Sequence, residues 1–289
     1  MSQALFPVFS LIFLGALLQW QNFPGKEFWR GAEKLTYYLL FPALLFLKLS
    51  DSEVGANEIQ AIALVVLSTL LMITMLLLLI GRSFGIKGPV FTSFFQGGIR
   101  FNTYVGLASV NELFGQAGMT IAALTLGLMI PLVNLLCIWI FELSVPTGNR
   151  SIRGMLVNIV KNPLIIACVV GLSWGWLGLS LPQTLESVLL LLAGTALPLG
   201  LLAVGTGIHL GALRGIGVTF FLSSAVKLLV LPLMLFTMSS WLGLNDMTTL
   251  VLVVIGSLPT ASSAYILARQ LGGDGPMMAA VISGQTLLA

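Results

Sequence analysis

The clearest pattern in this chain is a series of long apolar runs that have no polar face. The run AIALVVLSTLLMITMLLLLI at 61–80 is one example. Helices at the surface of a soluble protein keep a polar face, and membrane strands alternate apolar with polar residues, so such runs predict helices buried in a bilayer. A span needs about 20 apolar residues. Charged residues and Gly/Pro clusters divide the chain into ten candidate spans, at 3–21, 32–50, 58–82, 89–111, 117–142, 156–178, 184–209, 213–241, 247–270 and 274–289.

Composition supports this interpretation. Hydrophobic residues make up 57% of the 289 residues and charged residues only 8%. The mean hydropathy of +1.05 lies far above the range of soluble proteins. The sequence therefore predicts an all-α membrane protein whose main partner is the lipid bilayer, with little chain left for a soluble domain.

The charges between the spans predict the orientation of the protein. Cationic and acidic connections alternate, and 10 of the 13 Lys and Arg residues fall on one face. The positive-inside rule makes this face cytoplasmic. We therefore expect a multi-pass protein of the bacterial cytoplasmic (inner) membrane, with both termini outside.

The two halves of the chain also resemble each other. LLFPALL surrounds Pro42 in the second span, and TALPLGLLAVG surrounds Pro198 in the seventh. The fourth and ninth spans each carry a polar, helix-breaking cluster near their middle. Because five is an odd number of spans, the second half must be inverted relative to the first. We expect two inverted five-helix repeats, residues 1–146 and 147–289, within one membrane unit.

These two polar clusters form the candidate binding site. Gly97, Gly98 and Pro259 are expected to break the fourth and ninth helices at mid-membrane depth. Broken backbone is tolerated there only where it is buried in protein or lines a cavity, and paired broken helices in inverted repeats indicate a substrate site. The alternative is that small residues merely pack helices together. The polar residues expected to satisfy the free backbone groups or to bind a ligand are Asn102, Thr103, Thr260, Ser262 and Ser263.

Two cations, Arg100 and Lys227, lie in the middle of apolar spans, whereas every Asp and Glu lies at a predicted span end or in a loop. A charge at that depth costs at least about 2.5–3.5 kcal/mol, so it needs a partner or a wet cavity. We expect Arg100 to contact an anionic substrate, with capping of the broken helices as the alternative. For Lys227 we expect compensation of the negative half-helix ends, with substrate contact as the alternative. Asn134 and Gln96 are further candidates, with interhelical hydrogen bonds as their alternative.

Several motifs are similar to those of the auxin efflux carrier family, which includes plant auxin exporters and bacterial permeases for malonate or malate. They are RFNTYVGLA followed by ELFG, then IPLVN, and finally LPTASSAYILARQLGGD. The resemblance covers essentially the whole chain. It implies a ten-helix fold in which helices four and nine cross at their broken centres and a mobile domain moves against a scaffold. It also implies that Asn102 and residues 259–263 line an organic-anion site. Plant members carry a proline at the break of the fourth helix, and this chain has none at that point, so Gly97 and Gly98 are expected to supply the break.

The expected function is that of a secondary transporter. It would carry a small organic anion, a carboxylate of the auxin, malonate or malate type, by alternating access. An anion channel is one alternative, and a cation-coupled transporter of similar fold for another small amphipathic solute is the other. The sequence has no HExxH motif, no GxSxG motif and no phosphate-binding loop, so we do not expect an enzyme. We expect no cofactor, no metal and no nucleic-acid partner, and a homodimer is an open alternative to a monomer.

Overall fold

The computed structural model describes residues 2–51, 55–145, 161–215 and 217–289. The regular structure of these residues is helical, and none of them lies in a strand. Within them, four helical segments are long and apolar enough to cross a membrane: Ala56–Ser83, Gly88–Ser144, Gln183–Thr206 and Val218–Trp241. The prediction of an all-α membrane protein is therefore confirmed.

The helices follow the predicted spans closely. In the first half they are α1 (Ser2–Trp20), α2 (Lys26–Leu35), the π-helical turn η1 (Thr36–Leu40), α3 (Phe41–Ser50), α4 (Ala56–Ser83), α5 (Gly88–Ile99) and α6 (Thr103–Ser144). In the second half they are α8 (Pro163–Trp176), α9 (Gln183–Thr206), the 3₁₀ turn η2 (Leu210–Gly215), α10 (Val218–Ala225), the π-helical turn η3 (Val226–Val230), α11 (Leu231–Trp241), α12 (Asp246–Gly256), α13 (Ser263–Leu271) and α14 (Gly275–Leu288). The start of the predicted span 156–178 and the predicted repeat boundary at 146/147 lie outside the described residues.

A sharp turn inside α6 separates the fourth and fifth predicted spans. Gly115 has φ 59° and ψ −147°, a conformation that a residue with a Cβ rarely adopts. The helix therefore consists of two segments, one on each side of this glycine, and the chain reverses between them. This reversal agrees with the predicted spans 89–111 and 117–142.

The break in the fourth span lies later than predicted. Gly97 and Gly98 are helical residues of α5, so the prediction that they open the helix is wrong. Their role is close packing, because an added Cβ would lie 2.8 Å from Val281 Cγ1 at Gly97 and 2.6 Å from Leu77 Cδ2 at Gly98. The helix ends instead at Arg100, whose backbone is extended (φ −73°, ψ 154°). In the ninth span the break comes where predicted, because Pro259 lies between the end of α12 and the start of α13.

Two prolines explain the two π-helical turns. Pro42 and Pro232 each occupy the second position of a helix that directly follows such a turn. A proline has no N–H, and its ring clashes with the carbonyl of the residue four positions earlier. A widened turn removes that clash without interrupting the span. Each wide turn also carries a residue of interest, Tyr37 in η1 and Lys227 in η3.

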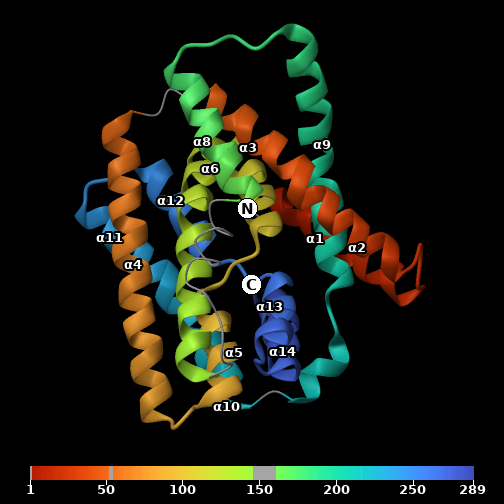
Figure 1. The fold of residues 1–289 in the computed structure, drawn as a ribbon, viewed down its shortest axis with the longest axis vertical. Helices are drawn as coiled ribbons and strands as arrows, with labels where there is room; N and C mark the ends of the chain where they lie inside the picture. The colour runs from red at the N-terminus through yellow and green to blue at the C-terminus, as the bar shows by residue number, and fades with distance from the viewer. Residues whose placement is uncertain (1, 52–54, 146–160, 216) are drawn as a thin grey trace.

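Two groups of helices pack around α6. Helices α1, α3, α8 and α9 form one group, and α4, α5 and α10 to α14 form the other. Figure 1 shows α1 and α9 on one side of the molecule and α4 and α11 on the other. Because α6 contacts members of both groups, the boundary between the groups runs along α6.

The contact between α1 and α9 depends on two glycines, and this gives a first prediction. A Cβ at Gly205 would lie 2.0 Å from the backbone oxygen of Ile12, and one at Gly15 would lie 2.1 Å from that of Leu202. Neither backbone can move without separating the helices. We expect Gly205→Ala to lower the thermal unfolding temperature of the purified protein, since overpacking costs about 1–3 kcal/mol.

Gly194→Ala is the matched control. It lies on the same helix, and an added Cβ there meets nothing within 4 Å. Because Ala favours helix over Gly, this variant should be as stable as the wild type or slightly more stable. Equal unfolding temperatures for the two variants would contradict the assigned packing.

Candidate functional site

The two helix breaks lie against each other. The backbone N–H of Asn102 donates a hydrogen bond to the Pro259 carbonyl at 2.8 Å. The Thr260 hydroxyl donates to the Gly97 carbonyl at 3.2 Å. The end of α5 and the segment between α12 and α13 are therefore joined directly, although they are about 160 residues apart in the chain.

Asn102 caps the helix that follows the first break. Its side-chain oxygen accepts hydrogen bonds from the backbone N–H groups of Tyr104 at 3.1 Å and Val105 at 3.3 Å. The first turn of α6 has free N–H groups, and Asn is a preferred residue for satisfying them. Asn102 is buried, so water cannot replace this cap. The Asn102 side chain thus satisfies two of the N–H groups that the break leaves free.

Gln285 of α14 holds the two breaks together. Its amide nitrogen donates to the Gly97 carbonyl at 2.9 Å and to Ser224 Oγ at 3.3 Å. Its amide oxygen accepts from the Thr260 backbone N–H at 3.0 Å and from the Thr260 hydroxyl at 2.7 Å. The side chain is fully buried. One residue of the last helix thus satisfies a free carbonyl on one broken helix and a free N–H on the other.

Lys227 lies at the end of α12. Its ammonium group donates to the Gly256 carbonyl at 3.0 Å and lies 5.8 Å from the centre of the Phe101 ring. Gly256 is the last residue of α12, where the helix dipole is negative. Lys227 is fully buried, and this contact is the one that charge compensation of a half-helix end requires.

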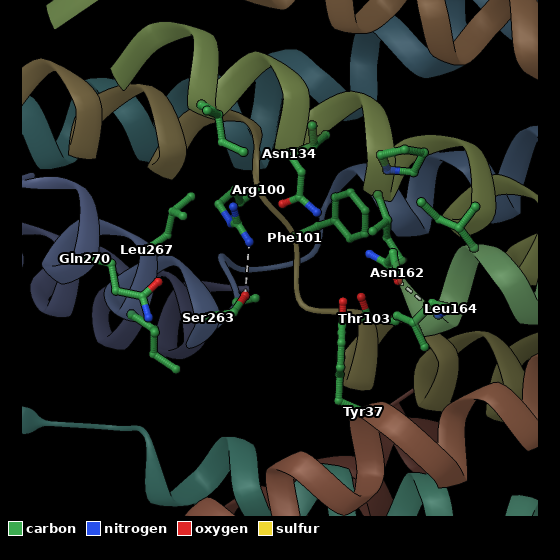
Figure 2. A pocket seen from close by; sticks show the side chains of 17 residues that line it. Tyr37, Arg100, Phe101, Thr103, Asn134, Asn162, Leu164, Ser263, Leu267 and Gln270 are labelled. Carbon is green, nitrogen blue, oxygen red and sulfur yellow. Dashed lines mark hydrogen bonds between the residues drawn. The ribbon is translucent and has the colours of Figure 1, made fainter. Parts of the chain in front are cut away.

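A cavity of about 360 Å³ lies beside the breaks, and Figure 2 shows its side chains converging on a common space. Its polar lining consists of Tyr37, Arg100, Thr103, Asn134, Asn162, Ser263 and Gln270. The other lining residues are apolar. An apolar cavity with a few convergent polar groups is typical of a small-molecule site.

The sequence predicted part of this lining. Among the predicted substrate-binding residues, the structure brings together Arg100, Thr103, Asn134 and Ser263. Asn102, Thr260 and Ser262 do not line the cavity. Asn102 and Thr260 are occupied by the hydrogen bonds between the breaks, and Ser262 lies next to Gly207. Gln96, another candidate, is fully buried in α5 and is also absent from the lining.

The polar cavity residues that the sequence analysis missed are Tyr37, Asn162 and Gln270. Asn162 left a recognisable signal, because Asn followed by Pro is typical of a helix start, and Asn162 accepts a hydrogen bond from the Leu164 N–H at 2.9 Å. The signal for Tyr37 is weaker: Pro42 predicts a widened helical turn just before it, and Tyr37 lies in that turn. Gln270 left none.

Arg100 gives the cavity its charge. Its Nη2 donates to Ser263 Oγ at 3.2 Å, as Figure 2 shows. Its Nη1 is buried and donates to no oxygen or nitrogen of the described residues, and the guanidinium has the Cys137 thiol as a neighbour. A guanidinium offers several donors in one plane, and that geometry matches a carboxylate. The cavity therefore contains a cationic group with N–H donors that have no oxygen or nitrogen acceptor among the described residues.

The site has no features of a metal centre. The described residues contain no group of three or more His, Cys, Asp and Glu side chains that could hold a metal ion. Divalent cations need such anionic or imidazole ligands.

Comparison with known proteins finds similarity to membrane transport proteins. A family model described as "Membrane transport protein" matches residues 148–289. A protein of Rhizobium meliloti (strain 1021) named "Putative malonate transporter" is 25% identical over 304 aligned residues, which cover 98% of this chain and 90% of that protein. Both matches agree with the resemblance to the auxin efflux carriers and with the expectation that the chain is not an enzyme. The chain is therefore similar to membrane transport proteins, over its second half to the family model and over nearly its whole length to the Rhizobium meliloti protein.

Proposed function

We propose that this protein is a secondary transporter that carries a small carboxylate across the cytoplasmic membrane by alternating access. The observation that carries the proposal is the position of Arg100. Its side chain lines the cavity beside the two helix breaks, and its buried Nη1 donates to no oxygen or nitrogen of the described residues. A buried guanidinium nitrogen without a partner is costly, and a bound carboxylate would accept its hydrogen bonds.

The cavity composition supports a small organic anion. Arg100 and the polar groups of Thr103, Asn134 and Ser263 can bind the oxygens of a carboxylate, while the apolar walls can contact a short carbon skeleton. Malonate is the first substrate to test, because a relative over nearly the whole chain carries that substrate in its name. Malate and monocarboxylates are the next.

The proposed architecture is the predicted one, with ten membrane helices in two inverted repeats, residues 1–146 and 147–289, and with both termini outside. The paired breaks support it. The fourth and ninth spans are both interrupted, and the hydrogen bond from Asn102 to Pro259 joins the two interruptions. Substrate sites of inverted-repeat transporters lie at such paired breaks.

Transport in liposomes tests the function. Purified protein in liposomes should take up radiolabelled malonate with saturation, and unlabelled malonate inside the vesicles should accelerate that uptake by counterflow. Both properties follow from a site that faces one side at a time. Liposomes without protein provide the background.

The same vesicles separate the alternatives. Currents that correspond to many ions per opening, without counterflow, would indicate an anion channel and contradict the proposal. Uptake of a neutral or amphipathic solute that depends on a sodium or proton gradient, with no uptake of carboxylates, would favour the cation-coupled alternative.

A further inference from the structure

A second cavity lies on the other side of the helix breaks. Its volume is about 380 Å³, and it is lined by residues of α1, α3, α6 and α9. Its polar lining residues are Lys48, Asn111 and Glu112. Lys48 is cationic and Glu112 is anionic, so this cavity has side chains of both charge signs. In the proposed topology these residues lie near the outer surface of the membrane.

The two cavities follow each other along the same helices. On the helix formed by η1 and α3, Tyr37 lines the first cavity and Leu44 lines the second. On α6, Thr103 lines the first cavity and Ala108 the second. Seven residues of helix correspond to about 10 Å, and five residues to about 8 Å. Only a short barrier therefore separates the cavities, and two helices bound it independently.

An aromatic pair fills this barrier. Phe41 lies between Tyr37 and Leu44, and Tyr104 lies between Thr103 and Ala108. The rings of Phe41 and Tyr104 are stacked with their centres 4.9 Å apart and their planes 25° apart. Phe41 is fully buried.

Gly200 of α9 closes the third side of the barrier. A Cβ at this position would lie 2.9 Å from Tyr104 Cδ1 and 3.5 Å from Phe41 Cε2. The rings thus pack directly on the α9 backbone and leave no room for a side chain. Position 200 also adjoins the second cavity, because Leu201 lines it.

We propose that the two cavities are the two halves of one translocation path, and that the Phe41–Tyr104 stack on Gly200 is the barrier that closes the path in this conformation. The inference rests on the proposed transport function. Phe41 belongs to the group of α1, α3, α8 and α9, whereas Tyr104 belongs to α6, which also packs on the other group. A relative movement of the two groups would separate the rings without breaking an ion pair or a backbone hydrogen bond between them.

Cysteine labelling tests the barrier without requiring transport. In a variant in which Cys137 and Cys168 are replaced by Ala, Asn111→Cys reports on the second cavity and Asn134→Cys on the first. A charged, membrane-impermeant thiol reagent is applied to right-side-out and to inverted vesicles. We expect the two cysteines to react from opposite sides.

Removing a ring should then connect the cavities. Adding Tyr104→Ala should raise the reaction rate of Asn134→Cys from the Asn111 side by about tenfold or more, because the space of the lost ring admits water. Phe41→Ala should act in the same way and serves as a second variant if the first fails to fold. Tyr104→Phe keeps the ring and should keep the barrier. The matched control is Tyr38→Ala, which removes a 65% exposed tyrosine of η1 next to the lining residue Tyr37. This variant should leave the reaction rate of Asn134→Cys from the Asn111 side unchanged.

Two results would overturn the inference. One is rapid labelling of Asn134→Cys from the Asn111 side without any ring removed, a result that does not depend on the folding of a ring-removal variant. The other is an unchanged rate in folded Tyr104→Ala and Phe41→Ala proteins. The expected labelling pattern in a protein that takes up no carboxylate would leave the barrier in place and contradict only the proposed function.

Discussion

Arg100→Gln is expected to weaken carboxylate binding by about 100-fold or more while the protein still folds. The side chain lines the cavity, and its Nη1 donates to no oxygen or nitrogen of the described residues, so Gln would remove both the charge and the donors available to a carboxylate. Charge-assisted hydrogen bonds contribute about 1.5–3 kcal/mol each, and two of them account for the expected loss. Binding is measured by calorimetry with malonate and by the malonate-dependent shift of the thermal unfolding temperature.

Two further variants define what is lost. Arg100→Lys keeps the charge but not the planar donor arrangement, so it should weaken binding by about tenfold. Arg82→Gln makes the same change of charge at an exposed position in the last turn of α4 that is not part of the cavity lining, and this variant should bind like the wild type. A folded Arg100→Gln protein with wild-type affinity would contradict the substrate role. The alternative is that Arg100 caps the broken helix. In that case Arg100→Gln should lower the thermal unfolding temperature, Arg100→Lys should keep the wild-type temperature, and neither variant should change the affinity for malonate.

The sequence predicted the elements of this fold well because their pattern is local. An apolar run such as 61–80 is compatible with little other than a membrane-buried helix, and α4 covers Ala56–Ser83. The two breaks also left local signals, Pro259 in one span and the cap residue Asn102 in the other. Arg100 stood out for a physical reason, because a cation in an apolar span requires a special environment.

The error at Gly97 and Gly98 shows where local signals fail. Glycine weakens a helix, but it equally permits two helices to approach each other, and the sequence does not distinguish these uses. Here the neighbouring side chains of Val281 and Leu77 determine the outcome. The break lies at Arg100 instead, where backbone and side-chain groups from the other broken helix and from α14 replace the lost helical hydrogen bonds. Those partners are distant in the chain.

The sequence analysis also missed some residues of the polar network, for the same reason. Gln285, like many polar residues in membrane helices, carries no motif. Its importance depends on the meeting of Gly97, Thr260 and Ser224, which come from three different spans. Tyr37 and Gln270 likewise became candidates only when the cavity was seen. Hydrogen bonds between polar groups of several helices depend on the tertiary structure, so a local sequence pattern does not predict them.

Gln285→Leu is expected to destabilise both helix breaks at once. Leu is similar in size but has no polar atoms, so the Gly97 carbonyl loses its amide donor and the Thr260 N–H loses its acceptor. A buried polar group left without a partner costs about 1–3 kcal/mol. We expect a lower thermal unfolding temperature and faster hydrogen exchange, measured by mass spectrometry, in two separate segments, 100–105 and 258–263. Simultaneous loosening of two segments so far apart in the chain is the specific signature of a residue that joins them.

Thr286→Val is the matched control for this change. Thr286 is the next residue of α14, and its hydroxyl donates only to the Ile282 carbonyl of its own helix at 2.7 Å. Loss of that local bond leaves the helical ladder and both breaks intact, so stability and exchange should stay close to those of the wild type. Gln285→Glu provides a second comparison, because it keeps an acceptor for Thr260 and loses the donor to Gly97. In this variant, hydrogen exchange should increase more in 100–105 than in 258–263. Equal exchange in Gln285→Leu and Thr286→Val would refute the role assigned to Gln285.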